Sequence, residues 1–202
     1  MKTMELRLKV NGESRRWTIA PGDLLLDVLR REGFFGVKRG CEKGECGACT
    51  VLLNGKPINS CLMFAAQAEG CEVLTIEGLA HGDTLDPLQE AFLDHGAVQC
   101  GYCTPGMLMS AKALLMENPL PSDQDIRVAL AGNLCRCTGY TTIVAAVRAA
   151  SGQETAAMGL PAAPEELAAE ATTDAEVLAD VESLLGEPPG SLGGRPDSEG
   201  SF

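Results

Sequence analysis

Alternation of apolar and polar side chains dominates the start of the chain. Every second position of residues 4–10 is apolar, and the alternation resumes at Trp17 and Ile19. Asn11 and Gly12 lie between the two runs, tolerate positive φ and suit a tight turn. The pattern predicts a β-hairpin.

Shorter runs further along predict the rest of a sheet. Residues 50–53 and 56–58 flank the turn pair Asn54-Gly55, which favours a second hairpin. Residues 72–76 predict one more strand.

One helix and one irregular loop separate these strands from the first hairpin. Residues 24–32 are apolar-rich, with Asp23 as the expected N-cap and Gly33 as the expected end. Residues 36–49 carry too much glycine and charge for a periodic element. The first domain, residues 1–78, is therefore expected to be a mixed sheet crossed by one helix.

From residue 79 onward the pattern becomes helical. Pro105 suits the first turn of a helix, Ser122 suits an N-cap, and Asn118-Pro119 suits a helix end. The expected second domain, residues 84–152, is a compact bundle of four short helices, and the expected fold class is α+β. The predicted helices cover residues 87–94, 107–116, 123–131 and 141–150.

The remaining residues, 153–202, predict an acidic and largely irregular tail. Residues 151–202 hold 11 acidic side chains and one basic, whereas residues 1–150 hold 17 and 15. A capping box at Thr173 and an apolar stripe predict one helix near 174–185. Two alternatives stay open, a partly helical solvated tail and a helix that docks on a partner subunit.

Composition narrows the classes of function. A content of 45% hydrophobic and 22% charged residues is ordinary for a soluble protein. Neither a basic nucleic-acid face nor an apolar run of membrane-spanning length is present in the sequence. The first residues offer no apolar signal core, so a cytoplasmic location is expected. Thiols stay reduced there, and the nine cysteines therefore indicate metal binding rather than disulfides.

The first candidate metal set lies in the glycine-rich loop and just after it. A C-x4-C-x2-C run with a distant fourth cysteine is the plant-type [2Fe-2S] pattern. Glycines such as Gly40 and Gly47 let the backbone curl and aim N–H groups at sulfur. The predicted ligands are Cys41, Cys46, Cys49 and Cys61.

The second set combines a C-x2-C pair with a C-x-C pair. Two segments that approach from opposite sides can close a four-sulfur shell. Zinc is the alternative for either set, although neither spacing is its usual arrangement. The predicted ligands are Cys100, Cys103, Cys135 and Cys137.

The other candidate residues have plainer interpretations. Cys71 is left over from both sets and is expected to be a small buried apolar residue. His81 and His95 are expected in a loop and at a helix end, because both sulfur sets are complete without them. The sequence contains no Ser-His-Asp set, P-loop or Gly-x-Gly-x-x-Gly fingerprint, so neither substrate chemistry nor nucleotide binding is expected of this chain.

Three segments resemble the small iron–sulfur subunit of the molybdenum hydroxylases, and the resemblance covers about residues 1–150. Gly96–Cys100 and Cys61–Ala66 are most similar to the bacterial xanthine dehydrogenase branch. The segments are residues 41–61, 99–106 (QCGYCTPG) and 133–140 (NLCRCTGY).

The resemblance implies a plant-ferredoxin-like (β-grasp) domain, a four-helix-bundle domain and two [2Fe-2S] clusters. It also implies a large partner subunit with a molybdenum-pterin cofactor and a medium partner subunit with FAD. The helical-domain cluster would lie nearest molybdenum and the ferredoxin-like cluster nearest the flavin. Gln99 and Cys137 would contact the pterin.

Two other functions remain as alternatives. A free-standing two-cluster electron carrier would need a charged surface for transient encounters, whereas a subunit needs a neutral docking face. A zinc-structured assembly module would hold zinc in place of iron. The nearly neutral charge of residues 1–150 favours the subunit.

Overall fold

The structure is a computed structural model, and it describes residues 3–153. These residues belong to one compact unit. Apart from Gln153, the expected tail lies outside the described residues, as does its helix near 174–185.

Five strands form one mixed sheet. They are β1 (Met4–Val10), β2 (Glu13–Ile19), β3 (Thr50–Leu53), β4 (Lys56–Asn59) and β5 (Glu72–Leu74). The order across the sheet is β2-β1-β5-β3-β4, with β1 and β5 parallel and the other neighbours antiparallel. The predicted hairpin turn is confirmed, because Asn11 and Gly12 have φ values of 53° and 82°.

Strand β5 ends two residues before the end predicted from the sequence. The backbone N–H of Thr75 donates to Asn11 Oδ1 at 2.8 Å, and Asn11 Nδ2 donates to Thr75 Oγ1 at 3.0 Å. The chain then enters the 3-10 helix η3 (Ile76–Gly78). A side chain of the first hairpin turn thus takes the place of a strand partner.

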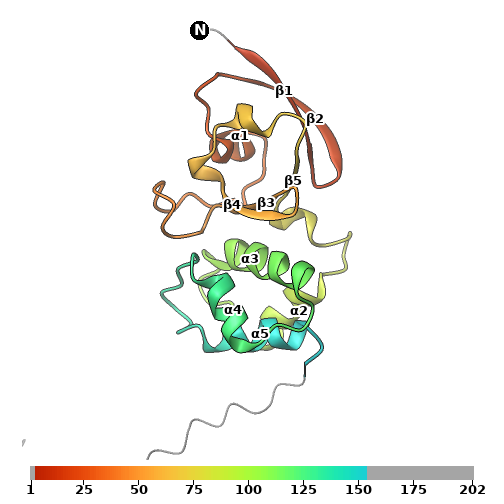
Figure 1. The fold of residues 1–202 in the computed structure, drawn as a ribbon, viewed down its shortest axis with the longest axis vertical. Helices are drawn as coiled ribbons and strands as arrows, with labels where there is room; N and C mark the ends of the chain where they lie inside the picture. Colours follow the sequence, from red (N-terminus) through yellow and green to blue (C-terminus); the bar gives the residue numbers. More distant parts are fainter. Residues whose placement is uncertain (1–2, 154–202) are drawn as a thin grey trace, which may run out of the picture. The chain divides into compact units, whose positions relative to one another are not determined.

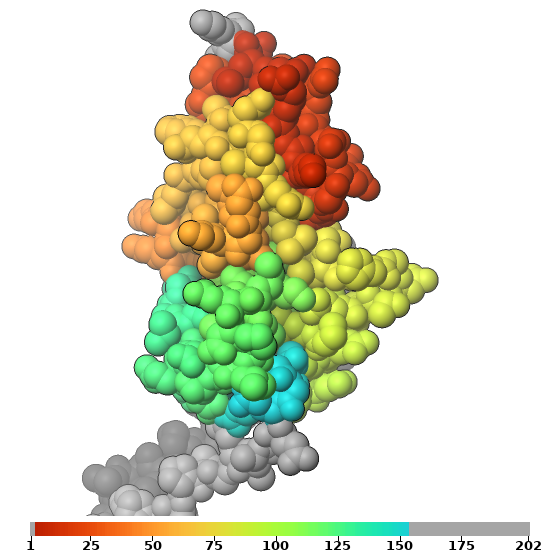
Figure 2. Space-filling model, turned by 45° about the vertical axis from the view of Figure 1, so that its right-hand side comes forward, coloured from red at the N-terminus to blue at the C-terminus, as the bar shows by residue number. Residues whose placement is uncertain are grey.

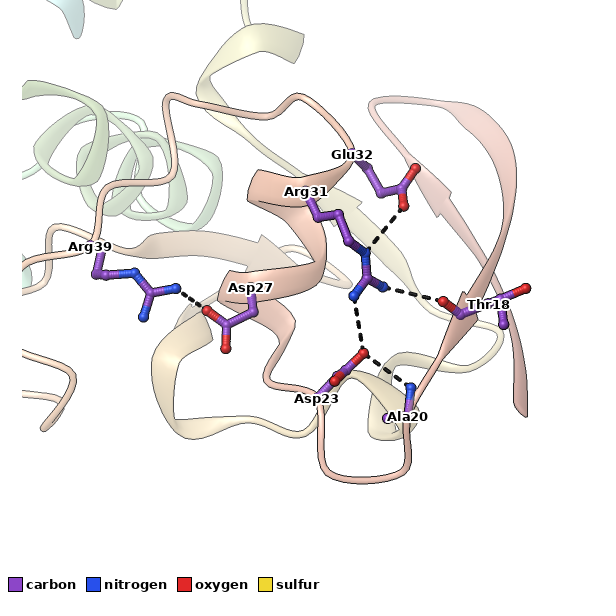
Figure 3. Close-up of polar contacts among 7 residues, drawn as sticks. All are labelled: Thr18, Ala20, Asp23, Asp27, Arg31, Glu32 and Arg39. Atoms are coloured by element: carbon purple, nitrogen blue, oxygen red, sulfur yellow. Dashed lines mark hydrogen bonds and ion pairs between the residues drawn. The ribbon is translucent and has the colours of Figure 1, made fainter. Parts of the chain in front are cut away.

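Helix α1 (Leu25–Arg31) buries four apolar side chains, those of Leu25, Leu26, Val28 and Leu29. The prediction that Asp23 caps this helix is wrong, because Leu24 is the N-cap and has no capping side chain. Asp23 Oδ2 instead accepts hydrogen bonds from the Ala20 N–H and from Arg31, as Figure 3 shows. The N–H of Leu25 donates to the Met63 carbonyl at 2.8 Å, so a neighbouring segment satisfies the helix end.

All four helices predicted for the second half are present. Ser122 caps α4 with its side chain, as predicted, and Asp86 caps α2 in the same way. Helix α3 begins three residues before the predicted start, with Pro105 in its first turn. The helices are α2 (Pro87–Asp94), α3 (Thr104–Glu117), α4 (Asp123–Leu130) and α5 (Thr141–Ala150), and two 3-10 helices, η1 (Ser60–Leu62) and η2 (Ala65–Ala68), precede β5.

Strand β3 is buried on both faces and joins two hydrophobic cores. Val51 packs in the core beneath α1, whereas Leu52 packs among the helices. Helix α3 lies against β3 and β4 (Figure 1), and in Figure 2 the orange surface of the strands meets the green surface of α3 directly. The two halves of the described chain are therefore closely packed.

The expected α+β class is confirmed, with a ferredoxin-like sheet followed by a helical domain. The domain boundaries, 1–78 and 84–152, stay a prediction. Within residues 3–153, none of the helices is long and apolar enough to cross a membrane.

Candidate metal centres

The first set of cysteines lies at the edge of the sheet that faces the helical domain. Cys41 and Cys46 belong to the loop between α1 and β3, and both are half-buried. Cys49 directly precedes β3, Cys61 lies in η1, and both of these are buried.

Cys41 and Cys46 form one pair in this set. The backbone N–H groups of Lys43 and Cys46 each lie 3.4 Å from Cys41 Sγ. Hydrogen bonds from the N–H groups of Lys43, Cys46 and Glu45, together with the Cys46 side chain, lower the pKa of Cys41 to about 6. Because the thiolate is the metal-binding form, this loop prepares Cys41 as a ligand.

Cys49 and Cys61 form the other pair. Burial is the largest influence on Cys49 and raises its pKa to about 11, and the nearby Cys61 thiol also raises it. Ser60 Oγ donates to the Cys49 carbonyl at 2.8 Å, which ties η1 to the start of β3. A buried thiol of this kind loses its proton when it binds a metal ion.

A glycine leaves room for the sulfurs of the first set. A Cβ atom on Gly40 would lie 2.7 Å from Cys46 Sγ and 3.4 Å from the Ala48 Cβ. Any side chain at this position would therefore displace Cys46. Together with the N–H groups around Cys41, this geometry fits a sulfur-bound cluster.

The second set is assembled from two segments of the helical domain. Cys100 is exposed and Cys103 is the half-buried N-cap of α3. Cys135 and Cys137 belong to the loop between α4 and α5, and Cys137 is exposed. The two segments are brought together, as the spacing predicts.

The four thiols of this set lie close enough to affect one another's pKa. Burial raises the pKa of Cys103 to about 12, and the neighbouring Cys135 and Cys100 thiols add to this effect. The Cys100 side chain raises the pKa of Cys137, and the Cys135 thiol raises it as well. Each cysteine of the second set therefore lies near at least two of the others.

Hydroxyl groups complete the surroundings of the second set. Burial is the largest influence on Cys135 and raises its pKa, but hydrogen bonds from Thr138 and from the Cys137 N–H outweigh it and leave the pKa lowered. Thr138 Oγ1 lies 3.2 Å from Cys135 Sγ, and the Cys135 N–H donates to the Tyr140 hydroxyl at 2.8 Å. Thr104 Oγ1, one residue after Cys103, is buried and has no partner among the described residues.

These observations fit two [2Fe-2S] clusters, each with two iron atoms to be ligated and sulfur atoms that accept hydrogen bonds. Four thiols arranged as two pairs, or as a closed ring, supply two ligands to each iron of a [2Fe-2S] cluster. The unpartnered Thr104 hydroxyl has the polarity to donate to such a cluster. In the part of the chain that is described, no three His, Cys, Asp or Glu side chains converge on a single metal ion.

Hydrogen bonds connect the loops that carry the two sulfur sets. The N–H of Leu134, next to Cys135, donates to the Cys46 carbonyl at 2.9 Å. The Tyr102 hydroxyl donates to the carbonyl of Arg39, two residues before Cys41. The Arg39 guanidinium pairs in turn with Asp27 of α1 (Figure 3).

The other candidate residues fall into two groups. Gln99 is exposed beside Cys100 and makes no hydrogen bond within residues 3–153. His95 is the C-cap of α2 and His81 lies in a loop, as expected. Cys71 is half-exposed rather than buried, because it follows the Gly70 turn at the rim of a surface cleft.

Sequence reasoning gave no role to Asn133 or Tyr102. Asn133 is 4% exposed and binds three polar groups, two of them in the ferredoxin-like half. In the sequence, Asn133 follows Gly132 at the end of the helix predicted for residues 123–131 and lies two residues before Cys135. An amide side chain at that place is the one local indication of a role. Its partners are far away in the sequence, so only the fold identifies them.

Both halves of the chain match known domain families. Residues 8–80 match the family described as 2Fe-2S iron-sulfur cluster binding domain. Residues 75–148 match the family described as [2Fe-2S] binding domain. The chain therefore contains two 2Fe-2S binding domains.

Named relatives share most of this chain. The nicotinate dehydrogenase small FeS subunit of Eubacterium barkeri is 53% identical over 149 residues, which cover 73% of this chain and 95% of the relative. The xanthine dehydrogenase iron-sulfur-binding subunit of Escherichia coli O157:H7 is 49% identical over 146 residues, which cover 71% and 91%.

A solved structure agrees with these relatives. A chain of quinoline 2-oxidoreductase from Pseudomonas putida 86 superposes with a TM-score of 0.73 at 46% identity, and the match covers 75% of this chain and 96% of that one. Shared sequence, shared fold and eight suitably placed cysteines all lead to the same assignment. The chain belongs to the small [2Fe-2S] subunits of the molybdenum hydroxylase family, which are electron-transfer subunits of multi-subunit oxidoreductases.

Proposed function

We propose that this chain relays electrons from a molybdenum-pterin centre on a large partner subunit to FAD on a medium partner subunit. One [2Fe-2S] cluster would be held by Cys100, Cys103, Cys135 and Cys137, and the other by Cys41, Cys46, Cys49 and Cys61. Each cluster supplies one-electron redox chemistry when bound. The chain itself positions the clusters and leaves substrate chemistry to its partners.

The observation that supports this order of the two sets is their unequal exposure. Cys100 and Cys137 are exposed, and the exposed Gln99 stands beside them. In the first set, Cys49 and Cys61 are buried. The second set can therefore meet a partner's cofactor at the surface, with the Gln99 amide and Cys137 as its contacts.

Apolar side chains beside the ligands favour a stable subunit over a free carrier. Tyr102 is 48% exposed between Cys100 and Cys103, and Leu134 is 57% exposed beside Cys135. Leu62, beside Cys61, is 61% exposed. Exposed apolar residues next to both sets suit permanent interfaces, whereas a transient carrier presents charge.

The substrate belongs to the complex rather than to this chain. We retain a xanthine dehydrogenase type as the prediction, with hypoxanthine as the first substrate to assay. Nicotinate follows, because a nicotinate dehydrogenase subunit is as similar to this chain as a xanthine dehydrogenase subunit is, at 53% against 49% identity. A cytoplasmic location also stays a prediction, since free thiols persist there before cluster insertion.

Purification of the complex through a tag on this chain tests the proposal. The expected product contains molybdenum, FAD, two further polypeptides, and about four irons and four labile sulfides for each copy of this chain. A chain with these clusters but without partners would support the free carrier. A colourless product that contains zinc would support the assembly module.

A further inference from the structure

A buried polar network joins the two halves of the described chain at Asn133. The Ser110 hydroxyl on α3 donates to Asn133 Oδ1 at 2.7 Å. Asn133 Nδ2 donates to the Gly47 carbonyl at 3.0 Å and to Thr50 Oγ1 at 3.3 Å. Thr50 Oγ1 donates to the same Gly47 carbonyl at 2.7 Å, so every member of the network has a partner.

Burial makes this network sensitive to changes in its geometry. Asn133 is 4% exposed, Ser110 6% and Thr50 7%. A buried amide that loses its partners keeps the full cost of its lost hydration, so the two halves favour the one arrangement that satisfies all three side chains.

Close backbone packing at two glycines enforces the same arrangement. A Cβ atom on Gly47 would lie 2.3 Å from the Gly132 carbonyl oxygen. A Cβ atom on Gly106 would lie 2.2 Å from the Gly47 carbonyl oxygen. The backbone of the loop that carries the first sulfur set is therefore in close contact with the start of α3 and with the loop that carries Cys135 and Cys137.

The residue after Asn133 makes the connection between the two ligand loops. Leu134 donates its backbone N–H to the Cys46 carbonyl at 2.9 Å, and Leu134 is bonded directly to Cys135. Cys46 and Cys135 are thus linked through main-chain bonds and one hydrogen bond. The three side-chain hydrogen bonds of Asn133 restrain the chain immediately before Leu134 and so restrain the segment that makes this hydrogen bond.

We propose that Asn133 is a positioning residue for electron transfer between the two sulfur sets. Its amide holds the Cys135 loop against the Cys46 loop and so maintains the Leu134–Cys46 hydrogen bond that couples them. The step would move one electron and no proton: the cluster held by the second set would be oxidised as the cluster held by the first set is reduced, and no bond would form or break. The inference rests on the proposed relay and adds to it a residue that is not a ligand.

The test compares Asn133→Ala with wild type in the purified complex, with Asn118→Ala as the matched control. Asn118 also lies in the helical domain, but its side chain bonds only the local N–H of Leu120 among the described residues. Two measurements describe the clusters themselves, namely the iron and sulfide content and the electron paramagnetic resonance spectrum of each reduced cluster. Two others describe their coupling, namely the magnetic interaction between the clusters and the hydrogen exchange of the Leu134 amide.

For Asn133→Ala the expected results are unchanged iron content and unchanged individual spectra. The magnetic interaction is expected to weaken, electron transfer between the clusters to slow, and exchange of the Leu134 amide to accelerate about tenfold or more. Asn118→Ala is expected to match wild type. Unchanged interaction and unchanged Leu134 exchange in Asn133→Ala overturn the proposal.

Ser110→Ala decides the question if Asn133→Ala does not fold. This change removes the hydrogen bond from the Ser110 hydroxyl to Asn133 Oδ1 and leaves the Asn133 side chain itself intact. A smaller change in the same two measurements is expected, and wild-type values in a folded Ser110→Ala complex overturn the proposal. Failure of the relay itself looks different, because wild type would then lack either its partner subunits or one of the two cluster spectra.

Discussion

The backbone N–H of Leu134 donates to the carbonyl oxygen of Cys46 at 2.9 Å. This bond joins a loop of the helical domain to the cysteine loop of the ferredoxin-like domain. Its donor, Leu134, directly precedes the predicted ligand Cys135, and its acceptor belongs to the predicted ligand Cys46. The Tyr102 bond to Arg39 joins the segment of Cys100 and Cys103 to the same cysteine loop. Packing between the halves and the placing of the two metal centres are therefore parts of one structure.

Gly106→Ala tests how tightly the halves pack. A glycine-to-alanine change inside a helix ordinarily stabilises it by about 1 kcal/mol. Here the new Cβ would lie 2.2 Å from the Gly47 carbonyl oxygen, so we expect a net loss of about 1–3 kcal/mol in the free energy of unfolding.

Gly132→Ala is the control for this change, because its Cβ would meet no atom within 4 Å. Its free energy of unfolding should stay within about 0.5 kcal/mol of wild type. Chemical denaturation measures both variants, and equal stabilities would contradict the close contact.

Gly40→Ala tests the space beside the first sulfur set. The added Cβ would lie 2.7 Å from Cys46 Sγ, so the sulfur must move and the first cluster should be lost. We expect about two irons per chain in place of about four, with the spectrum of the second cluster preserved. Gly22→Ala, with open space around its Cβ, should keep all of the iron.

Cys71→Ala tests whether the ligand sets are complete. Cys71 Sγ lies 3.8 Å from the Glu69 carbonyl oxygen, at the rim of a surface cleft of about 670 Å³ and on the β1–β2 side of the sheet. Both cluster spectra and the iron content should equal those of wild type. Loss of either spectrum would show that one of the two sets has been assigned wrongly.

Ser122→Ala tests the cap of α4. Ser122 Oγ accepts from the Asp125 N–H, and its removal should cost about 1 kcal/mol. Hydrogen bonds from Ser122 lower the pKa of Asp125, so this carboxylate stabilises the fold above its unfolded pKa of about 3.9 and loses that effect as the pH falls through its folded pKa. The effect of Ser122→Ala should therefore be equal at pH 7 and pH 5, and a difference between them in urea denaturation would exclude this explanation.

Local signals predicted most of the secondary structure. The Asn11-Gly12 turn, the Ser122 cap and the bounds of α5 depend on neighbouring residues, which a sequence displays directly. The predicted N-cap role of Asp23 is wrong because Arg31, eight residues away, competes for its carboxylate. The end of β5 was misjudged because Asn11 reaches across the sheet to Thr75.

Spacing predicted which cysteines would meet, but not how their loops are held. Ligand spacing is a local property of each loop, and in the structure the thiols of Cys100 and Cys137 lie close enough to interact. Asn133 acts through Gly47 and Thr50, more than 80 residues away in the sequence. Neither hydrophobic periodicity nor a local motif predicts a contact between residues so far apart in the sequence.

The most direct measurement of the relay is flavin reduction by substrate in the complex that carries Cys137→Ala. Stopped-flow absorbance follows the flavin, with Cys71→Ala as the cysteine control. We expect Cys71→Ala to reduce flavin at the wild-type rate, and Cys137→Ala to lose the second cluster, bind substrate and leave the flavin oxidised. Flavin reduction at the wild-type rate in Cys137→Ala would contradict the route assigned to this chain.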